Sequence, residues 1–230
     1  MSLTVLQYNH KSDSSFCAPN SLYLQINSMV ASYIDNSIFI ENISLDDIAS
    51  RIGFQKSTGS KINTENLSKL SNRTNKLIRK NKFKVPKLAL SFISNSAFFK
   101  EIDNAQNNKI YTICVSFSQY QKFLRKQNYF MGYYKSAEKL SDGYIQHCIT
   151  IIVGTSRESH KCIIIDPNIE LTNENRVIDI NQLKNEYPNK IEMVDKNEIK
   201  TLLTIRYDGL DDDNIIIDLD FEGNSNLDMY

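Results

Sequence analysis

The spacing of apolar residues predicts a long helix near the start of the chain. Between residues 22 and 34 they recur at three- and four-residue steps, which is the period of a helix. We expect this helix over residues 17–35, with Pro19 at an early position, where its missing N–H needs no partner. A shorter helix is expected over residues 45–53, because Ser44 can cap its start and Gly53 can end it.

Strand-like runs become frequent later in the chain. Residues 109–117 are β-branched and apolar, which predicts a strand in the interior of a sheet. Residues 144–154 and 161–165 are two further apolar runs, and the polar turn between them predicts a β-hairpin. Further strands are expected at residues 2–8, 202–207 and 214–221, and further helical segments at residues 66–87, 88–99, 118–128 and 180–187.

These elements predict an α+β fold in one domain. No repeat, linker or low-complexity tract divides the sequence, so we expect the domain to cover residues 1–222. We expect residues 223–230 to form a disordered tail.

Composition narrows the range of partners and locations. The chain has 230 residues with 41% hydrophobic and 23% charged residues, and its net charge of +0 implies no general attraction to nucleic acid. Its apolar runs are too short to span a bilayer, and its first residues do not resemble a classical signal peptide. Four cysteines do not make a disulfide scaffold, so Cys114, Cys148 and Cys162 are expected in the core, in a reducing compartment.

Cys17 is the first candidate for chemistry, because it lies where a polar loop becomes a helix. The free N–H groups and partial positive charge of a helix start favour an anion, so a thiol there ionises more easily. This is the environment of an activated nucleophile. The alternative is a small, buried and inert cysteine.

The predicted hairpin supplies a possible partner for that nucleophile. With its turn near residues 156–159, His147 and Asp166 lie close to opposite each other at the open end. A carboxylate beside an imidazole can fix its tautomer and stabilise its cation. Taken singly, His147 is better explained as a strand-end histidine and Asp166 as the start of an Asp-Pro turn. Together with Cys17, the catalytic interpretation is favoured.

We expect no metal and no cofactor. His147, Cys148, His160 and Cys162 include zinc-type ligands, but adjacent residues of a strand face opposite sides, so His147 and Cys148 cannot readily share an ion. Asp211, Asp212 and Asp213 lack the alternate spacing of an EF-hand loop, and a solvated acidic edge is the simpler interpretation.

The segment from Lys69 to Lys87 is strongly basic. It contains eight cations, Lys69, Arg73, Lys76, Arg79, Lys80, Lys82, Lys84 and Lys87. A helix with a solvated basic face is one interpretation, and a docking face for an acidic protein substrate is the other. The apolar stripe of this helix, Leu67, Leu70, Leu77 and Ile78, contains no aromatic residue and the whole chain is neutral, so we do not expect a nucleic-acid site.

The order of these parts resembles the papain-like cysteine peptidases, and most closely the C39-like peptidase group. The resemblance depends on three features: the helix-start Cys17, the run from His147 to Gly154, and the strand that ends in Asp166 and Pro167. The resemblance implies a papain-like fold, with a helical part over about residues 1–108 and an antiparallel sheet over about residues 109–222. It also implies Cys17 as nucleophile, His147 as base and then acid, and Asp166 as the orienting residue. It also implies that Gln7 lends its side-chain amide to an oxyanion hole.

The activity that the resemblance implies is cleavage of a peptide or isopeptide bond by a thiol protease through a thioester. The same fold hosts transamidases, deamidases and acyltransferases, and a catalytically inactive binding protein is a further alternative. The expected location is the cytoplasm, or secretion without a classical signal peptide as a bacterial effector. Residues 53–108 have no clear counterpart in the family.

Overall fold

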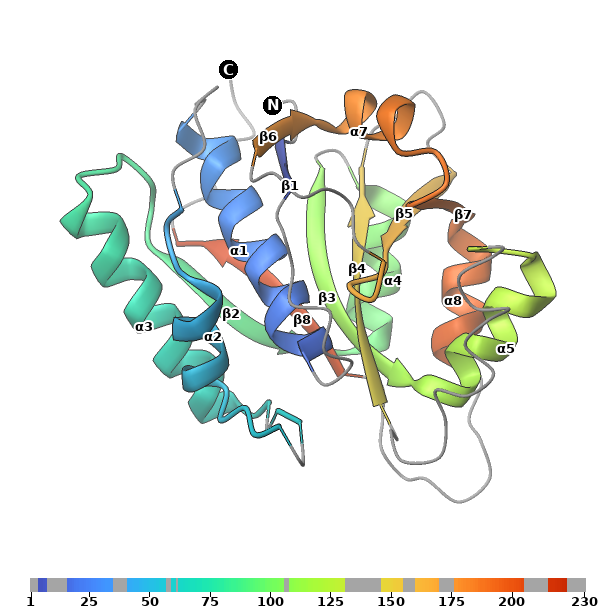
Figure 1. The fold of residues 1–230 in the computed structure, drawn as a ribbon, viewed down its shortest axis with the longest axis horizontal. Helices are drawn as coiled ribbons and strands as arrows, with labels where there is room; N and C mark the ends of the chain where they lie inside the picture. The colour runs from blue at the N-terminus through green and yellow to red at the C-terminus, as the bar shows by residue number, and fades with distance from the viewer. Residues whose placement is uncertain are drawn as a thin grey trace.

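The computed structural model confirms the α+β class, with one antiparallel sheet between two layers of helices (Figure 1). It describes residues 4–7, 16–34, 41–56, 59–60, 62–105, 108–130, 146–154, 160–169, 176–204 and 215–222. The expected tail at 223–230, the hairpin turn at 156–159 and the acidic run at 211–213 lie outside these residues.

The main sheet has six strands in the order β2-β8-β3-β4-β5-β7, and all neighbours are antiparallel. The strands are β2 (Leu88–Ile93), β3 (Lys109–Ser116), β4 (Gln146–Val153), β5 (Lys161–Ile165), β7 (Glu192–Asp195) and β8 (Ile215–Phe221). A separate two-stranded ribbon joins β1 (Thr4–Gln7) to β6 (Arg176–Asp179). The hairpin of β4 and β5 is therefore confirmed, and it lies toward one side of the sheet.

Helices cover both faces of the sheet, and each face has its own core. On one face lie α1 (Cys17–Ile34), α2 (Leu45–Arg51) and α3 (Thr64–Lys80). On the other lie α4 (Asn95–Asn104), α5 (Phe117–Gln127) and α8 (Lys196–Thr204). The short helix α7 (Ile180–Glu186) follows β6 and adds Leu183 to the first core.

Helix α1 is the central helix of the fold, because residues 18–31 are all buried. Two of its buried polar side chains bind neighbouring backbone groups. Gln25 Nε2 donates to the carbonyl oxygens of Ile110 at 2.8 Å and Ile217 at 3.0 Å, which lie on adjacent strands. Asn27 Oδ1 accepts from the backbone N–H groups of Asn42 and Ile43. These bonds fix α1 against the sheet and the segment before α2.

The helix expected over residues 66–87 ends at Lys80. Two other expected elements are wrong. The helix expected over 88–99 is a strand followed by a helix, because Leu88 and Leu90 alternate into the core while Ser94 caps α4 through the Ala97 N–H at 3.2 Å. Residues 202–204 belong to α8 and not to a strand, because Leu202 and Leu203 join Ile199 on its buried face. Residues 205–207 lie outside the described part. Strands β6 and β7 were not expected.

Candidate active site

Three elements bring the candidate residues together. Helix α1 begins at Cys17, His147 is the second residue of β4, and Asp166 follows the last residue of β5. The ladder pairs Thr150 with Ile165, so Asp166 lies diagonally from His147 and not directly opposite. Diagonal neighbours on one face of a sheet are within reach of longer side chains, and this offset still permits a direct contact.

His147 and Asp166 form a buried hydrogen-bonded pair. The Nε2 atom of His147 lies 3.0 Å from Oδ1 of Asp166, and the two residues are 3% and 0% exposed. Asp166 Oδ1 also accepts from the backbone N–H of Asn168 at 2.9 Å, which holds the carboxylate in place. Because Nε2 is engaged by Asp166, Nδ1 is the ring nitrogen left for another partner.

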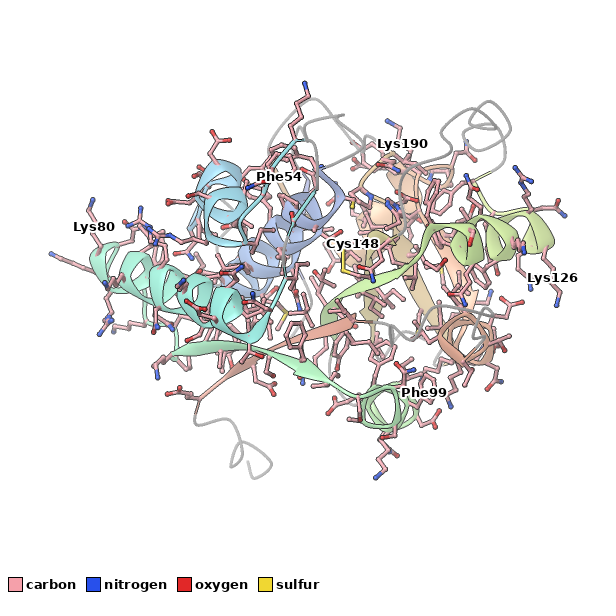
Figure 2. All side chains as sticks on the ribbon, turned by 90° about the horizontal axis from the view of Figure 1, so that it is seen from below. Phe54, Lys80, Phe99, Lys126, Cys148 and Lys190 are labelled. Carbon is pink, nitrogen blue, oxygen red and sulfur yellow. A yellow bond between two sulfur atoms is a disulfide. The ribbon has the colours of Figure 1, made fainter. Side chains whose placement is uncertain are left out.

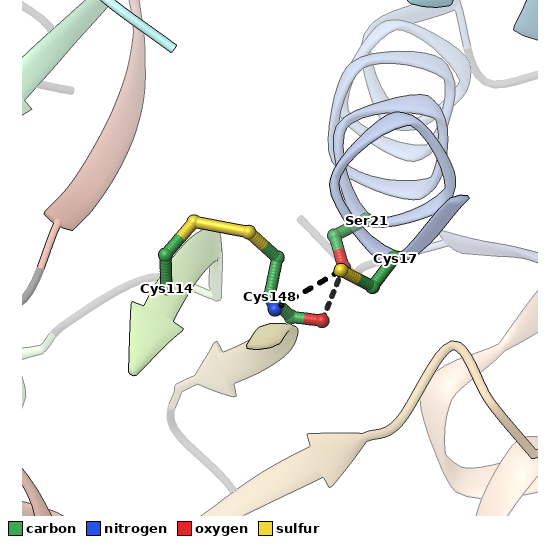
Figure 3. Close-up of a disulfide and its surroundings, with 4 residues drawn as sticks. All are labelled: Cys17, Ser21, Cys114 and Cys148. Atoms are coloured by element: carbon green, nitrogen blue, oxygen red, sulfur yellow. Dashed lines mark hydrogen bonds between the residues drawn. A yellow bond between two sulfur atoms is a disulfide. The ribbon is translucent and has the colours of Figure 1, made fainter. Parts of the chain in front are cut away.

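That partner is the half-buried thiol of Cys17, which is hydrogen-bonded to the His147 side chain. The thiol has a second donor, because the backbone N–H of Cys148 points to Sγ at 3.5 Å (Figure 3). Cys17, His147 and Asp166 therefore form one continuous chain of contacts. This arrangement places an imidazole between a sulfur atom and a carboxylate.

Electrostatics in this chain favour the charged forms of the sulfur and the ring. Burial raises the pKa of Cys17, but the hydrogen bond and charge of His147 and the Cys148 N–H together lower it below its ordinary value. Burial also disfavours the imidazolium, yet the Asp166 carboxylate and the Cys17 sulfur raise the pKa of His147 to about 10. These shifts favour the thiolate of Cys17 and the imidazolium of His147 relative to the same groups in isolation.

Two aromatic rings that the sequence interpretation did not include pack against His147. The rings of Phe117 and Tyr120 each lie 5.5 Å from the imidazole ring. Both residues stand in the first turn of α5, which directly follows β3, and Val115 of β3 is paired with His147. The three-residue spacing of Phe117 and Tyr120 after a buried strand was the sequence signal that two rings share one helix face here.

The structure corrects the expectation that Cys114 and Cys148 are separate core thiols. Both are buried, as expected, but they form a disulfide between β3 and β4. They occupy directly paired positions, a relation that needs the strand register and is not visible in the sequence. Cys17 and Cys162 are the free cysteines.

The remaining candidates are less defined. Gln7 is the last residue of β1 and pairs with Arg176, but its side chain lies outside the described part, so its predicted role stays a prediction. Among the described residues, no group of three or more His, Cys, Asp or Glu side chains is placed to hold a metal ion. No helix in the described ranges is long and apolar enough to cross a membrane.

The site has the order and contacts of a thiol nucleophile with a histidine base and an orienting carboxylate. Comparisons of the chain with protein-family models, with curated proteins and with solved structures found no match. The contacts of Cys17, His147 and Asp166 are therefore the features of the molecule that indicate a function.

Proposed function

We propose that the protein is a papain-like thiol hydrolase that cleaves a peptide or isopeptide bond. The observation that carries the proposal is the position of His147, which is joined to Asp166 at 3.0 Å on one side and to the Cys17 thiol on the other. Nucleophile, base and orienting group in hydrogen-bond sequence are the geometric signature of covalent catalysis.

The first step would be attack of the Cys17 thiolate on the amide carbonyl carbon. A C–S bond forms, and the carbonyl electrons move to oxygen to give a tetrahedral oxyanion. When the oxyanion collapses, the C–N bond breaks and the imidazolium of His147 gives its proton to the leaving amine. The products of this half-reaction are a free amine and a thioester on Cys17.

The second step would use His147 in the opposite sense. The neutral imidazole takes a proton from water, whose oxygen attacks the thioester carbonyl, and the C–S bond then breaks. Asp166 keeps the ring oriented through both steps, because it binds the ring nitrogen Nε2. An amine in place of water would make the same site a transamidase.

We further propose that the basic segment binds an acidic region of the protein substrate. Three of its cations already have ion partners within this chain, Lys69 with Glu65, Arg73 with Asp47 and Lys87 with Glu222. The other five, Lys76, Arg79, Lys80, Lys82 and Lys84, are exposed and have no ion pair among the described residues. They gather at the end of α3 and just beyond it, where Figure 2 labels Lys80.

This basic surface is separate from the reacting groups. Helix α3 packs on the edge strand β2, and two strands stand between β2 and the β4 strand that carries His147. At about 4.8 Å per strand, that separation is roughly 14 Å. We therefore expect the five cations to act on substrate binding and not on the chemistry.

A thiol-directed probe tests the proposed function. A small chloromethyl ketone should label Cys17 in native protein, and Cys17→Ser should not be labelled at that position. A peptide library then shows whether the labelled site turns over, and mass spectrometry identifies new amine and carboxylate ends. Adding a primary amine separates hydrolysis from amine transfer. Selective labelling of Cys17 without turnover of any peptide would favour the inactive binding protein.

A further inference from the structure

Cys148 contacts the first turns of α1 through both of its backbone groups (Figure 3). Its N–H donates to Cys17 Sγ at 3.5 Å, and its carbonyl oxygen accepts from the Ser21 hydroxyl at 3.2 Å. Cys17 and Ser21 are four residues apart and so lie on the same face of the helix. The two bonds thus join one residue of β4 to the part of α1 that carries the nucleophile.

The backbone groups of Cys148 are available because β4 extends beyond its neighbour β5. The ladder between these strands begins at Thr150, two residues later. On the other side, Cys148 stands opposite Cys114 with a Cα–Cα distance of 4.0 Å, the close spacing of a pair without mutual hydrogen bonds. The N–H and carbonyl of Cys148 therefore point away from β3 and reach α1.

The side chain of Cys148 is held as well, by its disulfide to Cys114. The next pair along the ladder is Val115 with His147, so the disulfide lies one residue from the proposed base. Cys148 is thus fixed in three directions, by β3 through sulfur and by Ser21 and Cys17 through its backbone. No other residue of β4 has this set of contacts in the described part of the chain.

We propose that Ser21 and the Cys114–Cys148 disulfide are positioning elements that hold the Cys148 N–H on the Cys17 sulfur. The inference rests on the proposed role of Cys17 as nucleophile. Among the described residues, no hydrogen bond joins Ser21 or Cys114 to Cys17 Sγ or to the His147 ring. They act through the Cys148 backbone, which supplies a donor that is already oriented before the reaction and needs no rearrangement.

This arrangement makes the site sensitive to reduction. A dithiol such as dithiothreitol breaks the S–S bond, two thiols form on Cys114 and Cys148, and the dithiol becomes a cyclic disulfide. The β3–β4 ladder remains, but Cys148 loses the covalent restraint on the side away from α1. We expect the reduced protein to stabilise the Cys17 thiolate less than the oxidised protein does.

Ser21 can be tested with a matched control on another helix. Ser71 also joins a helix to a strand, because its hydroxyl accepts from the Leu90 N–H at 2.9 Å, far from Cys17 in the fold. Ser21→Ala should slow alkylation of Cys17 by iodoacetamide near neutral pH by about three- to tenfold and shift its pH profile upward. Ser21→Thr should restore the profile. Ser71→Ala should lower the melting temperature and leave the profile unchanged.

The disulfide is tested by comparing the oxidised protein, the dithiol-reduced protein and the Cys114→Ala, Cys148→Ala double variant. The reduced protein and the double variant should both show an upward shift of the pH profile of Cys17 alkylation. Peptide mapping should show the Cys114–Cys148 bond in the oxidised protein alone. Unmoved profiles with a lower melting temperature would give Ser21 and the disulfide a purely structural role and overturn the proposal. A shifted profile in the variants, together with a wild type that turns over no peptide, would contradict the proposed function and leave the positioning role intact.

Discussion

The two free cysteines, Cys17 and Cys162, carry the same chemical group in opposite environments. Burial disfavours the thiolate of both. Cys162 lies in β5 and the nearby charges of Lys196, Asp195 and Lys200 oppose one another, so burial raises its pKa to about 12. The pKa of Cys17 is instead lowered. Position in a core does not decide thiol acidity in this fold.

The difference comes from two specific partners. His147 gives Cys17 a hydrogen bond and a positive charge, and the Cys148 N–H gives it a second donor. Cys162 has neither contact among the described residues, although both cysteines are close to strand β4 and its ladder. The lowered pKa of Cys17 is therefore a property of the junction between α1 and β4, and removing one partner should raise that pKa.

The largest expected effect comes from His147→Ala, which should make Cys17 resemble Cys162. Loss of the imidazolium leaves the thiolate without its counter-ion, so alkylation near neutral pH should slow sharply. Turnover should fall by about 10⁴-fold or more. Alkylation rates of the two cysteines, followed by mass spectrometry against pH, measure the comparison directly. Rapid alkylation of Cys17 in this variant would show that the helix start alone activates the thiol.

The pH dependence of the wild type follows from the same pair. Activity should rise with pH as Cys17 loses its proton, and the midpoint of this rise should lie below the ordinary thiol pKa of 9.0. Activity should fall again as His147 loses its proton near pH 10. The raised pKa of His147 also contributes stability that is fully present below pH 6.5 and is lost as the pH rises through about 10.

Asp166→Asn should move the alkaline limb of the activity profile to lower pH, with about a ten- to hundredfold loss of turnover.

Gln7→Ala should have a smaller effect than His147→Ala and leave the comparison of the cysteines intact. If its side-chain amide binds the oxyanion, its loss should lower kcat by about 10²–10³-fold. The alkylation profile of Cys17 should not move, because no oxyanion forms in that reaction. Thermal unfolding is the control, and an equal loss of stability would give Gln7 a structural role in the β1–β6 ribbon.

Much of the fold can be predicted from local pattern. The α1 helix, the Ser44 cap of α2 and the hairpin of β4 and β5 follow from apolar period, capping residues and turn composition. The error at residues 88–99 has a tertiary cause. A short apolar run fits a strand or a helix until its neighbour is known, and here β8 pairs with it.

The candidate site divides in the same way. Residue types and chain order indicate Cys17, His147 and Asp166, because each carries chemistry in its own side chain. The contributions of Cys148, Ser21 and Phe117 depend on strand register, on a backbone N–H and on a packed ring. Cys148 and Ser21 leave no distinct signal in a single sequence. The spacing of Phe117 and Tyr120 can be seen in the sequence, but the partner of these rings is known only when the elements are assembled.

The smallest expected effect is on substrate binding, and it should leave the difference between Cys17 and Cys162 unchanged. Reversal of Lys76, Arg79 and Lys80 to glutamate should raise KM for an acidic protein substrate about tenfold at low salt, and the increase should shrink as salt screens the charges. The rates at which Cys17 and Cys162 react with a small thiol reagent should not change.

A matched reversal on α5 decides whether location matters for that result. Lys122, Arg125 and Lys126 are also exposed cations on one helix, and their reversal to glutamate makes the same change in net charge. If the basic surface at the end of α3 is the docking site, the α5 variant should keep a KM close to that of the wild type. Equal increases in both variants would show that the substrate responds to net charge alone, and the basic segment would then be a solvated helix face.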